Sequence, residues 1–315
     1  MPPSLLQMPD VVMCLILKKS NFRSIQNLRK SCRDLRKRID DISPDSDCAT
    51  FRLKFFPDFL NFSIYFGRDF EEERFSNFYR KNEEKDFLKV AFRDARILLD
   101  STNNPMDFFG LFLEQDCAPL PEFLEILEPY LKSRKTPLKV RDFTILVEEA
   151  EQVLKVLPYL EDPEVLNIHF SKFSKNLEVP INKIVHLDQW KTAKELYSST
   201  FFKEVQPENL LHFKRVHLEM DVVSDEMVLK IRKAFLESPH MEHFQFKVEG
   251  CTADSELEKL YGPPFIYSFQ NQKMWFFSVP DDSEHVVFIK FNSSFVVFER
   301  IDSDEVFAGA AVINE

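Results

Sequence analysis

The apolar positions near the N-terminus predict short helices. Pro9 suits the first position of a helix, where its missing N–H costs nothing, and residues 11–17 are apolar without a break. At 3.6 residues per turn such a run is apolar on every side, so other groups must cover more than one face of the helix. We therefore expect two or three short helices over residues 5–40, with more apolar surface than they bury among themselves.

The segment that follows, residues 22–39, is amphipathic. Its apolar residues recur at spacings of three and four, which predicts a helical stripe: Phe22, Ile25, Leu28, Cys32, Leu35 and Ile39. Basic residues occupy the other side: Arg23, Arg29, Lys30, Arg33, Arg36, Lys37 and Arg38. So short a segment cannot bury the remaining face of the first helix, which leaves either the downstream chain or another protein to cover it.

Strand and helix patterns alternate beyond a polar stretch at residues 41–50, where we place a domain boundary. Period-two alternation or apolar runs predict strands at 59–66, 75–79, 108–113, 140–146, 165–170, 195–197, 213–220 and 243–248. Helical periodicity predicts helices at 86–100, 121–131, 148–160, 188–194 and 225–237, and residues 184–187 are a further short apolar run. The irregular strand–helix units after residue 138 resemble leucine-rich repeats, and a doubly wound sheet is the competing fold.

The C-terminal part predicts a small β meander. Three strands are expected at residues 274–278, 286–291 and 295–301, where they would cover the open end of the preceding sheet. The residues after Asp302 are small and polar, so we expect a frayed tail.

Charge is distributed unevenly along the 315 residues. Residues 1–42 carry nine Lys and Arg and four Asp, a net charge of +5, whereas the whole chain carries −11, so the remainder carries −16. A basic N-terminal segment favours an acidic partner, and an acidic remainder does not favour nucleic acid. The five scattered cysteines fit reduced, buried thiols in an intracellular protein. Neither a signal peptide nor a stretch approaching the ~20 apolar residues of a membrane span is apparent.

The sequence offers little catalytic chemistry. With only five glycines it has no phosphate-binding loop, and it has neither a nucleophile elbow nor a cysteine or histidine spacing typical of zinc. The histidines and the acidic clusters fit surface or structural roles, and Trp190 and Trp275 fit the core. We therefore expect no catalytic residues, no metal and no cofactor.

The N-terminal segment resembles an F-box, in the form common in nematode F-box proteins. The resemblance rests on Met8-Pro9-x-x-Val12-Met13, on Ile16-Leu17 and on Ser24-Ile25-x-x-Leu28-Arg29-x-x-Cys32-Arg33-x-Leu35-Arg36. Two positions depart from the general pattern, since many F-boxes have an acidic residue where Val12 stands and an aromatic residue where Leu35 stands. Both departures keep or increase apolar character.

Residues 60–250 resemble the FTH domain that follows the F-box in the same proteins. The matching stretches are Val156-Leu157-Pro158-Tyr159-Leu160, Leu166-Asn167-Ile168, residues 184–196, His212-Phe213-Lys214-Arg215 and Leu236-Glu237-Ser238-Pro239. We therefore expect an α/β protein with a small N-terminal helical F-box at residues 1–42. A leucine-rich-repeat-like α/β recognition domain, the FTH domain, would occupy 51–250, a short C-terminal β meander 251–302 and a tail 303–315.

The resemblance implies a substrate-recognition subunit of a Skp–cullin–F-box ubiquitin ligase, which itself catalyses no reaction. The F-box would bind a Skp-type adaptor, and through it a cullin–RING ligase. Residues 110–250 would hold an unknown protein substrate on a concave face or on loops. The implied adaptor-binding residues are Leu6, Met8, Pro9, Val12, Met13, Ile16, Leu17, Leu28, Arg33 and Leu35. The implied location is intracellular, in the cytoplasm or the nucleus.

Three alternatives stay open at this point. In the first alternative, the chain is a non-degradative protein-interaction scaffold. The sequence does not distinguish this role from that of a ligase subunit. An enzyme with a site at the strand ends is a lesser alternative. Nucleic-acid binding by the basic helix is a minor one.

Overall fold

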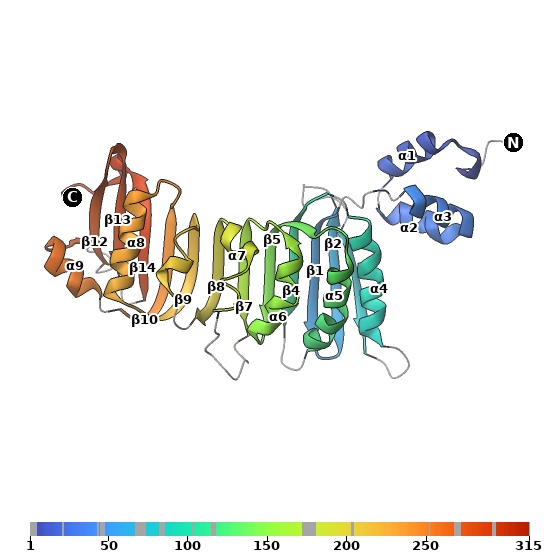
Figure 1. Cartoon of the computed structure of the whole chain (residues 1–315), viewed down its shortest axis with the longest axis horizontal. Coiled ribbons are helices and arrows are strands. Elements are labelled where there is room, and N and C mark those ends of the chain that lie inside the picture. The colour runs from blue at the N-terminus through green and yellow to red at the C-terminus, as the bar shows by residue number, and fades with distance from the viewer. Residues whose placement is uncertain are drawn as a thin grey trace. The chain divides into compact units, whose positions relative to one another are not determined.

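The computed structural model describes residues 5–314 except 21, 43, 45–47, 67–73, 82–85, 103, 115–117, 172–180, 203–204, 252, 268–271 and 292–293 (Figure 1). The chain divides into two compact units, Met1–Asp142 and Phe143–Glu315. The division falls inside strand β5 (Leu138–Val147).

Three short helices begin the first unit, in agreement with the apolar pattern. A 3-10 turn at Leu5–Gln7 precedes α1 (Asp10–Lys19), α2 (Phe22–Ser31) and α3 (Arg33–Ile42). Pro9 is the N-cap of α1, with φ −56° and ψ 151°. The helices bury a core of their own, made of Met13, Leu17, Ile25, Leu35 and Ile39, with Leu5, Leu28 and Ile42 packed against it.

A four-stranded sheet follows in the first unit. Its strands lie in the order β4 (Met106–Leu113), β1 (Cys48–Phe56), β2 (Phe59–Phe66), β3 (Arg74–Arg80). Strand β1 is antiparallel to β2 and parallel to β4. Helices α4 (Phe87–Asp100) and α5 (Leu120–Ser133) lie on one face (Figure 1), where Phe123 of α5 meets Phe55 of β1 with ring centroids 5.1 Å apart. The polar stretch at 41–50 ends earlier than predicted, because Cys48 and Thr50 are buried at the start of a central strand.

Successive parallel strands dominate the second unit. Strands β5, β7 (Val165–Phe170), β8 (Glu195–Phe202), β9 (Arg215–Val223) and β10 (His243–Cys251) are neighbours in chain order. Val165, Glu195, Arg215 and His243 are paired in register, so β7 to β10 begin at the same level. Helices α6 (Ala150–Leu154), α7 (Asp188–Thr192) and α8 (Asp225–Glu237) lie on one face (Figure 1). A doubly wound sheet reverses its strand order at a switch point, whereas this order is sequential, which confirms the repeat-like α/β fold.

An antiparallel meander completes the second unit, as predicted. Helix α9 (Ala253–Tyr261), which the sequence did not predict, leads to β11 (Phe265–Tyr267), β12 (Gln272–Val279), β13 (Asp282–Phe291) and β14 (Phe295–Asp302). Strand β14 pairs with β10 and thereby covers that edge of the parallel strands. The prediction of a frayed tail is wrong. A 3-10 turn at Ser303–Glu305 is followed by β15 (Val312–Ile313), which pairs with β12.

Other connections differ from the predicted elements. Helix α6 ends at Leu154, and a 3-10 turn at Leu157–Tyr159 leads to β6 (Leu160–Glu161), because Pro158 disfavours a continuing helix. The apolar run at 184–187 lies in turns, and a 3-10 turn at Pro207–Asn209 precedes β9. His212 precedes β9 in a turn, where its Nε2 donates to the carbonyl oxygen of Trp190 at 2.8 Å. Both predicted core tryptophans, Trp190 and Trp275, are buried.

Candidate functional site

Helix α1 presents an apolar stripe to solvent. Val11 is 72% exposed, Leu15 56% and Val12 38%. Positions 11 and 15 lie about one turn apart and position 12 lies beside them, so the three side chains share one side of the helix. Met13 and Leu17 point to the other side and are buried in the core of the three helices.

The ten residues predicted to bind an adaptor fall into three groups. Three lie in the helical core: Met13, Leu17 and Leu35. Three are half-buried: Met8, Ile16 and Leu28. Four are exposed: Leu6, Pro9, Val12 and Arg33. The prediction missed Val11 and Leu15, although the unbroken apolar run contained the signal, because the side opposite Met13 and Leu17 must face outward.

Arg38 fixes the segment before α1, a role that the sequence pattern did not predict. Its guanidinium donates to the carbonyl oxygens of Leu5 at 3.2 Å and Leu6 at 2.9 Å, and to that of Met8. It also pairs with the carboxylate of Asp10 at 2.7 Å. Because these carbonyl groups lie before α1, outside its own hydrogen bonds, their bonds to Arg38 hold the start of α1 against α3.

The basic side of α2 and α3 is partly used within the domain. Arg29 pairs with Asp40 at 2.7 Å, and Arg36 donates to the carbonyl oxygen of Arg29 at 3.1 Å. Lys30, Arg33 and Lys37 are exposed.

Two thiols of this helical segment correct the expectation of buried cysteines. Cys14 and Cys32 are exposed, because Cys14 lies on the outer side of α1 and Cys32 lies between α2 and α3. Cys48 is buried, as expected, whereas Cys117 lies outside the described residues.

Strand pleating gives the sheet of the second unit two different faces. On one face Leu196, Val216 and Phe244 are buried, and Phe235 of α8 meets Phe244 with ring centroids 5.2 Å apart. The alternate residues point to the opposite face and are polar or half-buried. We call this second surface the open face.

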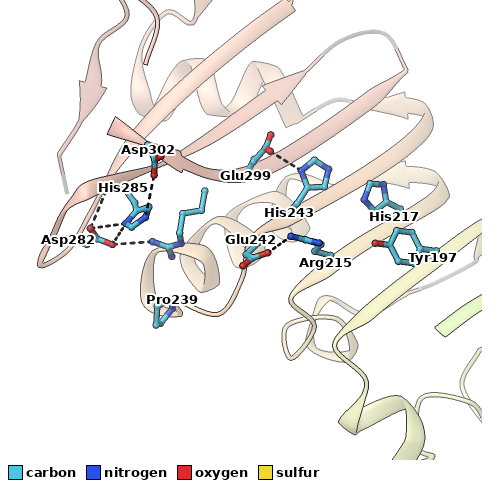
Figure 2. Close-up of a pocket in the computed structure, with 11 residues that line it drawn as sticks. Tyr197, Arg215, His217, Pro239, Glu242, His243, Asp282, His285, Glu299 and Asp302 are labelled. Carbon is cyan, nitrogen blue, oxygen red and sulfur yellow. Dashed lines mark hydrogen bonds and ion pairs between the residues drawn. The ribbon is translucent and has the colours of Figure 1, made fainter. Parts of the chain in front are cut away.

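Three rings stack along the open face (Figure 2). Tyr197 of β8 and His217 of β9 are direct partners in the register, with ring centroids 5.0 Å apart and planes at 17°. His217 and His243 of β10 follow at 4.9 Å and 23°. Burial, and to a lesser degree the charge of His243, lowers the pKa of His217 below its ordinary 6.5. The His217 ring is therefore neutral near pH 7.

Charged groups flank this ring stack. Arg215 pairs with Glu242 at 2.8 Å and lies 3.6 Å from Glu195. On the other side, Nδ1 of His243 lies 3.4 Å from Oε1 of Glu299. The hydrogen bond from His243 lowers the pKa of Glu299.

A second histidine–carboxylate group lies on β13 and β14. Nδ1 of His285 lies 2.8 Å from Oδ2 of Asp282, and its Nε2 lies 3.6 Å from Oδ1 of Asp302. Together with the ring stack these residues line a shallow hollow of about 660 Å³ (Figure 2). Among the described residues, no group of three or more His, Cys, Asp or Glu side chains is placed to hold a metal ion.

Comparisons with known proteins identify two domains in this chain. Residues 5–47 match the F-box domain family and residues 121–264 match the FTH domain family. The chain therefore contains an F-box domain followed by an FTH domain, and the resemblance to nematode F-box proteins is confirmed. It is similar to F-box A protein 224 of Caenorhabditis elegans, with 20% identity over 279 residues that cover 87% of this chain and 71% of that protein. No solved structure matches it.

These matches define the class of protein. An F-box domain implies an adaptor role in a ubiquitin ligase through binding to a Skp-type protein. The F-box and FTH families are adaptor and interaction domains rather than catalytic ones. Within the described residues, no helix combines the length and apolar character needed to cross a membrane.

Proposed function

We propose that this chain is the substrate-recognition subunit of a Skp–cullin–F-box ubiquitin ligase and performs no catalysis itself. The observation that carries the proposal is the exposed stripe of Val11, Val12 and Leu15 on an F-box helix whose other side is already packed. A contiguous apolar surface on a small domain is typical of a protein-binding site. Such a role places the chain inside the cell, in the cytoplasm or the nucleus.

The proposed adaptor surface combines this stripe with the predicted residues around it. The exposed and half-buried members would contact the Skp-type adaptor: Leu6, Met8, Pro9, Val12, Ile16, Leu28 and Arg33. Met13, Leu17 and Leu35 would act indirectly, by holding the three helices together. The exposed cations Lys30, Arg33 and Lys37 favour an adaptor that is acidic at this point.

The open face of the second unit is the proposed substrate surface. Stacked strand–helix units present an extended surface to a partner, and this one carries rings and carboxylates on neighbouring strands. Holding a substrate beside a ubiquitin-charged enzyme raises the effective concentration of the substrate there.

Co-purification with a Skp-type adaptor tests the adaptor role. Leu15→Asp places a charge in the apolar stripe and is expected to abolish capture of the adaptor. The double change Pro9→Ala with Ile16→Asp is expected to have the same effect. Leu260→Asp is the matched control, because Leu260 in α9 is 52% exposed and Leu15 is 56% exposed. Absence of adaptor binding by the wild-type chain, or equal binding by the Leu15→Asp chain, would refute the proposal.

Protein turnover separates the ligase subunit from a non-degradative scaffold. The abundance of proteins cross-linked to the open face is compared in cells with and without this chain. A bound protein that accumulates when the chain is removed supports a ligase subunit. Bound proteins of unchanged abundance would instead support the scaffold.

A further inference from the structure

The meander of the second unit buries apolar side chains on both of its faces. On one face Phe277 of β12 meets Tyr261 of α9, with ring centroids 5.1 Å apart. On the other face a separate cluster is buried, made of Met274, Phe276, Val286 and Phe288. Neighbouring residues of a strand point to opposite faces, so Phe276 and Phe277 belong to different sides of the sheet. The second cluster therefore needs a cover other than α9.

Strand register places this second cluster on the open face. His243 of β10 is the direct partner of Glu299 of β14. Glu299 is in turn the partner of Phe288 of β13, and Phe288 is the partner of Phe276 of β12. Side chains of direct partners lie on the same side of a sheet. The side of the sheet that carries the ring stack therefore continues into the apolar cluster.

The segment after β14 covers this cluster. Val306 and Ala310 pack against it, and Phe307 stacks on Phe265 of β11 with ring centroids 5.6 Å apart and planes at 8°. Farther along, β15 pairs with an edge of β12. We call residues 303–314 the strap. The strap thus covers both the apolar end of the open face and part of a strand edge.

The strap buries little of itself. None of residues 303–314 is buried, and Phe307 is 41% exposed, whereas the cluster beneath is 1–8% exposed. Strand β15 is only two residues long, and the hydroxyl of Ser278 donates to the carbonyl oxygen of Ile313 at 3.3 Å. Apolar burial supplies most of the stability of a folded segment. The strap should therefore open at a lower cost in free energy than the meander that it covers.

Gly309 forms a turn in the middle of the strap. Its φ is 87°, in the left-handed region that glycine adopts without strain. The N–H of Ala310 donates to the carbonyl oxygen of Phe307 at 2.9 Å across this turn. The turn lets the ring of Phe307 and strand β15 contact the meander at the same time.

We propose that the strap is a detachable cover of the open face, which opens while the rest of the second unit stays folded. Opening uncovers the rings of Phe265 and Phe276 and the edge of β12. A free strand edge beside apolar side chains accepts an extended segment as a further strand, and the strap itself is the segment that fits. The closed strap withholds this end of the open face from a partner. That consequence rests on the proposed substrate surface, whereas the opening itself does not.

Hydrogen exchange tests the opening on the wild-type chain. The backbone N–H groups of residues 310–313 are expected to exchange at least about ten-fold faster than those of β13. Gly309→Ala should accelerate this exchange by about five-fold more, because alanine is strained at a left-handed φ. An added Cβ meets open space there. Gly262→Ala is the matched control, since Gly262 has φ 80° and equally open surroundings but lies outside the strap, whose exchange should stay unchanged.

A labelled peptide of residues 303–315 tests the site beneath the strap. A chain that ends at Asp302 lacks the strap, and fluorescence anisotropy is expected to show that it binds this peptide. The wild-type chain should bind at least about ten-fold more weakly, because its tethered strap competes at an effective concentration of the order of millimolar. The same peptide with Phe307→Ser and Val312→Ser is the control and is expected not to bind.

These results decide the inference separately from the proposed function. Strap N–H groups as protected as those of β13 would overturn it, and so would a shortened chain that melts cooperatively but does not bind the peptide. If the shortened chain does not fold, the Gly309→Ala chain replaces it and must bind the peptide more tightly than the Gly262→Ala chain. Adaptor capture is measured on the same samples. A negative exchange or peptide result with adaptor capture intact refutes the strap alone, whereas absence of capture by the wild type refutes the ligase role.

Discussion

Strand register creates the ring stack of the open face. Tyr197 and His217 are paired directly, and His243 is the register partner of Arg215, two residues before His217 on β9. Adjacent strands lie about 4.8 Å apart, close to the distance at which planar rings stack. The centroid separation of 5.0 Å between the directly paired Tyr197 and His217 therefore follows from the strand spacing, whereas the 4.9 Å between His217 and His243 joins rings that are offset by two residues.

Three histidines of the second unit make its stability depend on pH. Burial is the main cause that lowers the pKa of His169, His212 and His217 below 6.5. The unfolded chain then binds protons more readily than the folded chain, so stability is fully present above pH ~6.5 and declines as the pH falls below it. We therefore expect the unfolding temperature to decrease when the pH is lowered from about 7.5 to about 5.5. This pH range lies above the one in which carboxylates titrate.

His169→Gln checks this assignment. The variant is expected to show a shallower dependence of unfolding temperature on pH than the wild type, because one of the titrating groups is gone. Nδ1 of His169 accepts from the backbone N–H of Ser199 at 3.1 Å, and glutamine offers a comparable acceptor. Greater stability of the wild type at the lower pH would contradict the prediction.

Gly110 in β4 lacks a side chain for an evident packing reason. An added Cβ would lie 2.5 Å from Cε2 of Phe112 and 2.6 Å from Cε1 of Phe108. The guanidinium of Arg52 lies over both rings, at 5.0 Å and 5.5 Å. Gly110→Ala should therefore force the rings apart and destabilise the protein by about 1–3 kcal/mol in urea unfolding. Alanine normally stabilises a strand relative to glycine, so a neutral or stabilising result would exclude this explanation.

Helix ends show which elements local sequence specifies. Ser224 is the N-cap of α8, and its hydroxyl accepts from the backbone N–H of Met227 at 3.3 Å. Asp86 caps α4 in the same way through the N–H of Lys89. A cap and its partner are three residues apart, so both helix starts follow from nearby residues.

Ser224→Ala is expected to lower the free energy of unfolding by about 1 kcal/mol, because the N–H of Met227 loses its acceptor. Ser224→Asp keeps an acceptor and adds a negative charge at the positive end of the helix, so it should retain most of the stability. Chemical unfolding of both variants measures the difference. Equal loss in the two variants would show that the cap does not contribute.

The three F-box helices form a hydrophobic core made of few residues. All the residues of that core lie between Leu5 and Ile42. A core of this size gives a domain only a few kcal/mol of stability. Its loss is expected to leave the sheets of the protein folded.

Ile39→Ala tests this separation. Ile39 is 1% exposed, and truncation of such a residue costs about 2–5 kcal/mol, comparable to the whole stability of so small a core. We expect hydrogen exchange to accelerate in α1 to α3 while the strands stay protected, together with loss of adaptor capture. Val287→Ala in the buried part of β13 is the control, and it should weaken the second unit without affecting adaptor capture.

Periodicity predicted elements well where one face of the element is uniformly buried. The helix at 225–237 and the strand at 165–170 have the bounds that their patterns predicted. The pattern at 148–160 failed because Pro158 divides it, and β15 was missed because its strand partner, β12, lies far away in the sequence.

The sequence alone determines three features of this protein. These are the three basic, apolar helices of the F-box, the alternation of strands and helices after it, and the absence of common catalytic motifs. These features depend on residues a few positions apart, where helical and strand periods act. Folding in three dimensions sets which side of α1 is left exposed at Val11 and Leu15, and it gives Arg38 its carbonyl partners. It also brings Tyr197, His217, His243 and Glu299 together. Those contacts join residues about 20 to more than 50 positions apart, and strand register and helix packing, rather than any local period, determine them.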